Sequence, residues 1–289
     1  MKQGTVEHAQ SLEPKRGNNM QSDHYTKKNR EAWNEAAGVH RKNRKVDYTE
    51  LFQNKNYSML DPILSSLLKK IPLDGSIIAQ LCCNNGRELL SIVNTTGAAG
   101  VGFDISDEFV AEAKLIAKSA NLNCQFIRKN LYDLRDEYLN TFDLILFTAG
   151  SLTWFHDLGK LFALVGRLLK PNGYLIIYEI HPFTNLLALK DEPGYEKSNP
   201  FKIVYSYFRN QPWITNTGAD YIGKTIYKSK TFTSFSHTLS DIIMAICSNE
   251  MIIKEFAEYP HDISAALEDI EKDKMVPLSY TLLLQKNKK

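Results

Sequence analysis

From residue 71 onward, short apolar runs alternate with longer amphipathic stretches. The apolar runs predict strands and the amphipathic stretches predict helices, because a strand in a parallel sheet is buried on both faces and a helix on one. Such alternation is typical of a mostly parallel sheet with right-handed crossovers. The predicted strands are 77–82, 99–104, 125–130, 142–147 and 174–180, and the predicted helices are 86–95, 107–120 and 157–169.

Two further strands are predicted near the C-terminus. We expect residues 251–259 and 278–285 to form these two strands as an antiparallel hairpin at the sheet edge. Before them, Thr238 to Asp241 has a capping-box pattern, which predicts the start of a helix. The predicted fold class is α/β: a Rossmann-like, mostly parallel seven-stranded sheet with helices on both faces and a C-terminal antiparallel hairpin strand.

The pattern also divides the chain into segments. Residues 1–22 are polar without periodicity, so we expect a disordered tail. Two amphipathic stretches, 25–40 and 61–68, predict an N-terminal helical lid, and the second has Asp as its N-cap and Pro in its first turn. The predicted segments are the tail (1–22), the helical lid (23–70), the core (71–182), an inserted cap of short antiparallel strands (183–236) and the completion of the sheet (237–289).

Charge and composition narrow the expected partners. The chain of 289 residues has a formal net charge of +2 with scattered basic residues, so no strong field points to nucleic acid. No apolar run reaches the roughly 20 residues that a membrane helix needs. The polar N-terminus lacks the core of a signal peptide. We therefore expect a cytoplasmic protein with a small-molecule substrate and no nucleic-acid or membrane partner; the oligomeric state stays open.

The cysteines and acids show no metal-binding pattern. No pair among Cys82, Cys83, Cys124 and Cys247 has zinc-ligand spacing, and the neighbouring Cys82 and Cys83 are a poor disulfide pair. No cluster of His, Asp and Glu has ligand spacing either. We expect reduced cysteines and no metal.

The segment from Ile77 to Glu88 carries the most specific chemistry. It predicts a strand, a tight turn of small residues and the start of a helix, and the next predicted strand ends on Asp104. Such an arrangement forms half of a nucleotide-binding crevice, in which the acid accepts hydrogen bonds from ribose hydroxyls. A dinucleotide site needs several glycines near the pyrophosphate, whereas this loop has Cys82 and Asn84 before its one glycine, Gly86. S-adenosylmethionine (SAM) has no phosphate, so the loop favours SAM over NAD.

Several motifs in this order resemble the class I SAM-dependent methyltransferases that act on small molecules. The resemblance runs from about residue 25 to the C-terminus. Within the first motif, Gln80 stands where the family usually has an acid, and Cys82 and Asn84 stand at two glycine positions. The motifs are Gln80–Gly86, Gly102–Ser106, Phe126–Leu134, Phe142–Ile145 and Leu168–Leu175, with further likeness at Asn29–Asn34 and Glu179–Pro182.

The resemblance implies roles for a set of cofactor-binding residues. Asp104 would hold the ribose, Asn130 would contact adenine, and the small residues that end the fourth strand would leave room at the sulfonium. Aromatic residues of the first helix either cover the cofactor or only pack the helix on the domain. The predicted cofactor-binding residues are Tyr25, Trp33, Cys82, Asn84, Gly86, Asp104, Ile105, Asn130, Leu131, Thr148, Ala149 and Gly150.

A separate group is predicted near the acceptor. His181 follows the fifth strand, and a histidine transfers protons readily near neutral pH, so it is the candidate catalytic base. Its alternative is a structural histidine before Pro182. Trp154, Glu179 and His237 are the candidate substrate-binding residues.

These observations predict transfer of the SAM methyl group, with S-adenosylhomocysteine (SAH) as product, to O, N or C of a small molecule. The many aromatic residues of the insertion point to an apolar or aromatic acceptor, unless they only form the insertion's own core. One alternative is a non-catalytic protein that binds SAM or SAH. A macromolecule methyltransferase ranks lower, because the Asn/Asp-Pro-Pro-Tyr type of tetrapeptide is missing after the fourth strand. An oxidoreductase ranks lowest.

Overall fold

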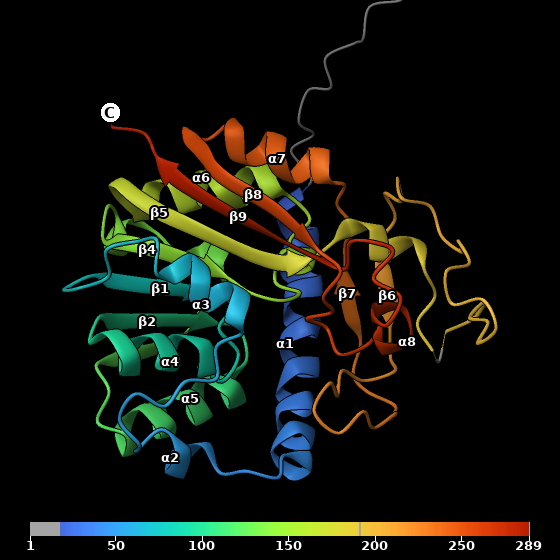
Figure 1. Cartoon of the computed structure of the whole chain (residues 1–289), viewed down its shortest axis with the longest axis horizontal. Coiled ribbons are helices and arrows are strands. Elements are labelled where there is room, and N and C mark those ends of the chain that lie inside the picture. Colours follow the sequence, from blue (N-terminus) through green and yellow to red (C-terminus); the bar gives the residue numbers. More distant parts are fainter. Residues whose placement is uncertain (1–17, 191, 289) are drawn as a thin grey trace, which may run out of the picture.

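The computed structural model describes residues 18–190 and 192–288, so the part of the predicted tail at residues 1–17 lies outside the described residues (Figure 1). The central strands are β1 (Ile77–Leu81), β2 (Ala99–Asp104), β3 (Cys124–Arg128), β4 (Phe142–Phe147), β5 (Leu169–Ile180), β8 (Met251–Tyr259) and β9 (Ser279–Lys286). They form a seven-stranded sheet in the order β3-β2-β1-β4-β5-β9-β8. β9 is antiparallel to both β5 and β8, whereas the other neighbours are parallel, so the predicted sheet and its edge hairpin are confirmed.

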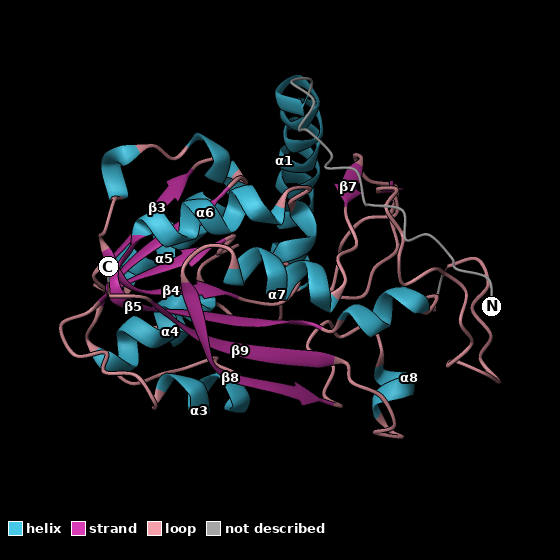
Figure 2. Ribbon diagram, turned by 90° about the horizontal axis from the view of Figure 1, so that it is seen from above, coloured by secondary structure: helices cyan, strands magenta, loops and turns pink. Residues whose placement is uncertain are grey.

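Helices cover both faces of this sheet (Figure 2). One face packs against α3 (Pro62–Leu68), α4 (Arg87–Thr96) and α5 (Asp107–Ser119), and the other against α6 (Leu158–Leu168) and α7 (Leu239–Cys247). The alternation of side chains along a strand explains the two cores: Ile78 belongs to the first, whereas its neighbour Ala79 belongs to the second. The capping box predicted for α7 is present, with Thr238 and Asp241 bonded to each other's backbone N–H groups.

The first helix, α1 (Asn18–Asn43), lies across the carboxyl ends of the parallel strands (Figure 1). It begins at Asn18, so residues 18–22 are helical and the predicted tail was too long. Arg30 of α1 donates two hydrogen bonds to Asp107 at the start of α5, at 2.7 and 2.8 Å. The hydrogen bond from Arg30 lowers the pKa of Asp107 to about 2, with a smaller contribution from the hydrogen bond that Asn34 donates. The short α2 (Tyr48–Leu51) follows α1 and packs near α5.

β5 begins earlier than predicted. The segment Lys170–Gly173 does end α6 at Leu168, but the chain enters the sheet at once, with Leu169 paired to Phe142. The register with β4 then shifts before Leu144, and Asn172 takes a left-handed backbone (φ 62°) that turns the chain back into the strand. The Pro and Gly signals therefore mark an irregularity within the strand as well as a helix end.

The insertion contains much less strand than predicted. After the short helix η4 (Pro182–Leu186), it has two strands of three residues, β6 (Trp213–Thr215) and β7 (Phe232–Ser234), which pair as a separate antiparallel sheet. The predicted strand at 225–235 is reduced to β7. Side chains take over backbone hydrogen bonds that a strand partner would otherwise make. The Asp220 carboxylate accepts hydrogen bonds from the backbone N–H groups of Ile222, Gly223 and Thr225.

The remaining short elements are η1 (Leu131–Asp133), η2 (Asp136–Tyr138), η3 (Leu152–Trp154) and α8 (Glu268–Glu271). Among the described residues, no helix is long and apolar enough to cross a membrane.

We expect Gly86→Ala to lower the free energy of unfolding by about 2–4 kcal/mol, since a β-carbon would lie 2.3 Å from the buried Phe126 ring and the backbone is left-handed (φ 74°). Gly97→Ala is the matched control, because its φ is 73° and no atom lies within 4 Å of the added carbon. The control loses only the backbone term, about 1 kcal/mol. Urea denaturation of both variants measures this, and equal losses would contradict the packing role of Gly86.

Candidate functional site

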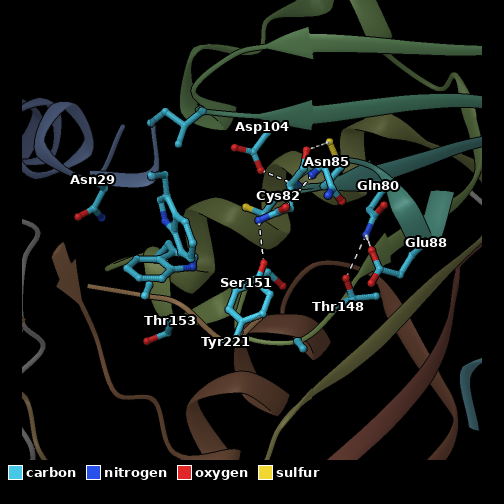
Figure 3. Close-up of a pocket in the computed structure, with 18 of the residues that line it drawn as sticks. Asn29, Gln80, Cys82, Asn85, Glu88, Asp104, Thr148, Ser151, Thr153 and Tyr221 are labelled. Atoms are coloured by element: carbon cyan, nitrogen blue, oxygen red, sulfur yellow. Dashed lines mark hydrogen bonds between the residues drawn. The ribbon is translucent and has the colours of Figure 1, made fainter. Parts of the chain in front are cut away.

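A cavity of about 620 Å³ opens at the carboxyl ends of β1, β2 and β4, beneath α1 (Figure 3). This volume lies in the range of small-molecule and cofactor sites. Its wall comes from the loop after β1, the end of β2, the segment before η1, the loop after β4, α1 and part of the insertion. The position agrees with the general rule that open α/β sheets bind ligands at the carboxyl ends of their strands.

The loop after β1 has a left-handed backbone at three positions, one of which is a glycine. Cys82, Asn84 and Gly86 all have left-handed backbones, with φ of 58°, 52° and 74°. Asn adopts this conformation more readily than most residues, whereas Cys82 is held there against its preference, at a cost of about 1–2 kcal/mol. Both Cys82 and Asn84 line the cavity, and both keep the left-handed backbone although neither is a glycine.

Asp104 is held in place by the two loops that it joins. Its Oδ2 accepts a hydrogen bond from the Asn84 backbone N–H at 2.8 Å, and its Oδ1 accepts one from the Ser106 N–H at 2.8 Å. Burial raises the pKa of this carboxyl group, and the backbone hydrogen bonds offset part of the rise. A carboxylate oxygen accepts more than one hydrogen bond, so each oxygen retains capacity toward the cavity.

A polar network lies beside the loop. Gln80, which is buried, donates from Nε2 to Thr148 Oγ1 at 3.0 Å, and its Oε1 accepts from the Leu89 backbone N–H at 3.2 Å (Figure 3). Arg87 and Glu88 follow at the start of α4 and form an ion pair at 2.8 Å. Both of these charged side chains line the cavity, which thus offers a cation and an anion close together.

α1 and the insertion cover the cavity. Trp33 of α1 packs edge-on against Trp154 and Phe232, with ring centroids 5.3 and 5.2 Å away, while also lining the cavity. The Tyr221 hydroxyl accepts from Asn84 Nδ2 at 3.0 Å (Figure 3). His40 donates from Nε2 to the Ala219 carbonyl at 2.6 Å. The insertion is therefore bonded both to the loop after β1 and to α1.

Most of the predicted cofactor residues line this one cavity. The structure brings together Tyr25, Trp33, Cys82, Asn84, Asp104, Ile105, Asn130, Leu131, Thr148, Ala149 and Gly150. Gly86 is the exception: it is the N-cap of α4 and packs against Phe126 rather than lining the cavity. Asn130 also has a local role, because its side chain accepts from the Tyr132 backbone N–H at 3.2 Å.

Glu179, predicted to bind substrate, holds the loop after β4. Its carboxylate accepts hydrogen bonds from the backbone N–H groups of Gly150, Ser151 and Leu152 at 2.6, 2.6 and 2.9 Å, and from the Ser151 hydroxyl at 2.6 Å. The residue is only 4% exposed. Burial raises the pKa of this carboxyl group, while the four donors lower it. Glu179 thereby positions Gly150 in the cavity wall.

A second cavity of about 300 Å³ adjoins the first. Of the residues predicted near the acceptor, Trp154 lines the first cavity and the rest line the second. His181 and His237 line this second cavity together with Glu179. His181 Nδ1 accepts from the Phe183 backbone N–H at 3.0 Å, so Nε2 carries the proton that it donates to Glu258 at 2.8 Å. Both ring nitrogens of this candidate base are therefore engaged within the protein.

Sequence reasoning missed several residues of the first cavity. Arg44, Arg87 and Glu88 supply its charged wall, and Tyr221 comes from the insertion. The position of Arg87 and Glu88 directly after the loop motif was a usable signal. No pattern pointed to Tyr221, because its place depends on the irregular fold of the insertion.

Within residues 18–190 and 192–288, no group of three or more His, Cys, Asp or Glu side chains is arranged to hold a metal ion. All four cysteines are free, and burial raises the pKa of the Cys82 and Cys83 thiols well above the usual range.

Comparison with known proteins agrees with this geometry. Residues 78–173, about a third of the chain, match the family model described as "Methyltransferase domain". Over 113 residues the chain is 33% identical to trans-aconitate 2-methyltransferase of Escherichia coli O139:H28, covering 38% of this chain and 42% of that relative. The same enzyme of Shigella flexneri serotype 5b matches to the same extent. The chain thus spans less than half the length of these curated relatives.

Two solved structures have a similar fold. A SAM-dependent methyltransferase from Methanosarcina mazei gives a TM-score of 0.56 at 18% identity, covering 80% of this chain and 99% of that one. One from Mesorhizobium loti gives 0.55 at 21% identity, covering 77% and 96%. The chain thus has the fold of class I SAM-dependent methyltransferases, and its residues 78–173 match the methyltransferase-domain family model.

We expect Glu179→Gln to lower the free energy of unfolding by about 2–3 kcal/mol, because an amide cannot accept from all four donors and turns its own N–H toward them. Glu258→Gln is the matched acid-to-amide control. Its side chain is 47% exposed and its amide oxygen still accepts from His181, so the loss stays below about 1 kcal/mol. Urea denaturation compares the two, and a loss for Glu179→Gln as small as the control's would refute the role of Glu179.

A pH-dependent contact supports the loop between β8 and β9, part of which lines both cavities. His261 bonds to Glu271 at 2.7 Å and Asp61 at 3.1 Å. Burial lowers the pKa of His261, but these two partners raise it by more, so the pKa lies above its ordinary value. The charged contact therefore contributes fully below about pH 6.5 and is lost as the pH rises through the raised value.

The free energy of unfolding of the wild-type protein should thus fall, relative to His261→Gln, as the pH increases above about 6.5. The side chain is 42% exposed, so screening limits the difference to below about 1 kcal/mol. Urea denaturation of both proteins across this pH range provides the comparison. Parallel pH profiles would show that His261 carries no such contact.

Proposed function

We propose that this protein transfers the methyl group of SAM to a small molecule. The observation that carries the proposal is Asp104, whose two oxygens are fixed by backbone N–H groups and still face a cavity of cofactor size. A pair of adjacent ribose hydroxyls matches such a carboxylate, since each hydroxyl donates one hydrogen bond. The left-handed backbones at Cys82, Asn84 and Gly86 support the proposal. They turn the loop sharply, and Cys82 and Asn84 on it line the cavity.

The donor set of the cavity fits the other parts of SAM. Ile105 and Leu131 are apolar partners for adenine, and Asn130 supplies a polar edge beside them. Arg87 and Glu88 offer opposite charges that suit the carboxylate and ammonium groups of the methionine portion. The small residues from Thr148 to Gly150 leave space where a bulky side chain would block an approaching acceptor.

When bound, SAM supplies a methyl group whose bond to positively charged sulfur breaks with the electron pair left on sulfur, while the acceptor gives a lone pair and loses a proton. The protein's own contribution is to align, to enclose and to exclude water. Holding two reactants in alignment contributes up to about 7–11 kcal/mol. α1 and Tyr221 close the cavity from above, which suits the exclusion of water.

The acceptor belongs to the proposal as well. The sequence relative acts on a small molecule by its printed name, trans-aconitate 2-methyltransferase, which supports a small-molecule acceptor here. We further propose the apolar or aromatic acceptor that the aromatic residues of the insertion suggest, two of which, Tyr205 and Trp213, line the second cavity.

A protein that binds SAM or SAH without turnover is the second candidate. It is favoured by one observation: both ring nitrogens of His181, the candidate base, are already bonded within the protein. Incubation with isotope-labelled SAM and a pool of phenols, amines and carboxylic acids separates the two candidates. Labelled acceptor supports the enzyme, and SAH binding without labelled acceptor supports the binding protein.

Calorimetric titration with SAH tests the cofactor site. We expect wild-type protein to bind in the micromolar range and Asp104→Asn to bind about 10- to 100-fold more weakly, because hydrogen bonds to a charged group contribute about 1.5–3 kcal/mol. Asp133→Asn is the matched control, since Asp133 is exposed and outside the cavity. Thermal unfolding checks that both variants are folded. Absence of SAH binding by the wild-type protein would overturn the proposal.

A further inference from the structure

The second cavity adjoins the first. Both are lined by Gly150, Thr153, Ile180, Leu189 and Ser264, so a molecule in the second cavity lies directly beside the end of the first where β4 and β5 finish. The volume of about 300 Å³ suits a single-ring compound rather than a second nucleotide. This neighbour relation makes it a candidate compartment for the methyl acceptor.

The described residues that line the second cavity include no Lys or Arg, so they bring no permanent positive charge to it. The first cavity, in contrast, has Arg44, Arg87 and Lys129. Arg209 stacks on the Trp213 ring at 3.9 Å, but its guanidinium donates to the carbonyls of Gln211 and Pro212 and does not line the cavity. An anion placed here would lose its hydration without gaining a cationic partner, which is costly.

The titratable groups of the second cavity are already satisfied or neutral. Glu179 accepts four hydrogen bonds from the loop after β4, and Glu192 accepts from the Leu189 backbone N–H at 2.9 Å. Burial lowers the pKa of both His181 and His237, which favours their uncharged forms. Neither histidine therefore replaces the missing cation.

One polar group in the second cavity lacks a partner. Tyr280 is 1% exposed and lines this cavity, and its hydroxyl has no hydrogen-bond partner among the described residues. An unsatisfied buried hydroxyl costs about 1–3 kcal/mol, so such a group calls for a bound partner. Burial raises the pKa of Tyr280 well above its usual value, so the hydroxyl stays protonated and can donate to an oxygen or nitrogen of a ligand.

Aromatic side chains form much of the remaining wall. The rings of Tyr205 and Trp213 meet edge to face with centroids 4.8 Å apart, and Phe235 lines the cavity as well. Such walls favour a flat apolar ring through offset or edge contacts.

We infer that the second cavity is the methyl-acceptor compartment and takes an uncharged ring compound with an oxygen that accepts a hydrogen bond from the Tyr280 hydroxyl. The inference rests on the proposed methyltransferase function and goes further by naming the chemical class. This acceptor class differs from the substrate named for the sequence relative, because trans-aconitate carries carboxylates and the described lining of this cavity has no Lys or Arg to bind them.

The test uses full-length protein saturated with SAH and two matched probes. The probes are p-hydroxyacetophenone, which is uncharged, and p-hydroxybenzoate, its carboxylate counterpart. Ligand-observed NMR titration should show the uncharged probe binding at least tenfold more tightly. Tyr280→Phe should weaken its binding about 2- to 13-fold, the range expected for one hydrogen bond, without changing the affinity for SAH.

Stability distinguishes ligand binding from a structural role for the hydroxyl. Because the hydroxyl is unpartnered, Tyr280→Phe should leave the free energy of unfolding unchanged or raise it. Tyr138→Phe is the control, since Tyr138 packs on Phe142 at the other end of the sheet and lines neither cavity.

Preference for p-hydroxybenzoate, binding of neither probe, or binding unaffected by Tyr280→Phe would each overturn the inference while SAH still binds. Loss of stability in Tyr280→Phe would likewise assign the hydroxyl a structural partner. If the wild-type protein fails to bind SAH at all, the proposed function itself fails, and that result is distinguishable from the others.

Discussion

The hydrogen bond from the Asn84 backbone N–H to the Asp104 carboxylate is the constraint on which the site depends. It joins the ends of β1 and β2, and the second carboxylate oxygen extends the link to Ser106 at the start of α5. To reach this geometry the loop must turn through left-handed residues, and it does so with Cys82 and Asn84 in place of glycine. The Ser106 hydroxyl in turn donates a hydrogen bond to Asn34 of α1. The helix that covers the cavity is therefore linked to the same end of β2.

The loop after β4 plays the corresponding part on the other side of the sheet's edge. Glu179 of β5 accepts hydrogen bonds from three consecutive backbone N–H groups of that loop. Gly150 and Thr153 of the loop line both cavities. A buried carboxylate so fully bonded is a positioning group rather than one that is free for substrate. Backbone that is fixed from β5 therefore lies where the two cavities meet.

The sheet and most of the lining of the first cavity were predictable because they rest on local patterns. Apolar runs and helical periods specify the core strands, and the residues after each parallel strand necessarily meet at one edge of the sheet. The insertion was not predictable, because side chains such as Asp220 take over backbone hydrogen bonds that a strand pattern assigns to a ladder. The positions of Tyr221 and of the unpartnered Tyr280 hydroxyl depend on contacts between segments far apart in the sequence. The hydrogen bond of His181 with Glu258 forms only once such segments have packed.

A crystal structure of the complex with SAH would show whether the first cavity binds the cofactor. We expect both ribose hydroxyls to lie within hydrogen-bond distance of the Asp104 carboxylate, with adenine between Ile105 and Leu131 and the second cavity left open beside the sulfur. SAH bound elsewhere, or bound here with its ribose away from Asp104, would contradict the assignment of this cavity as the cofactor site.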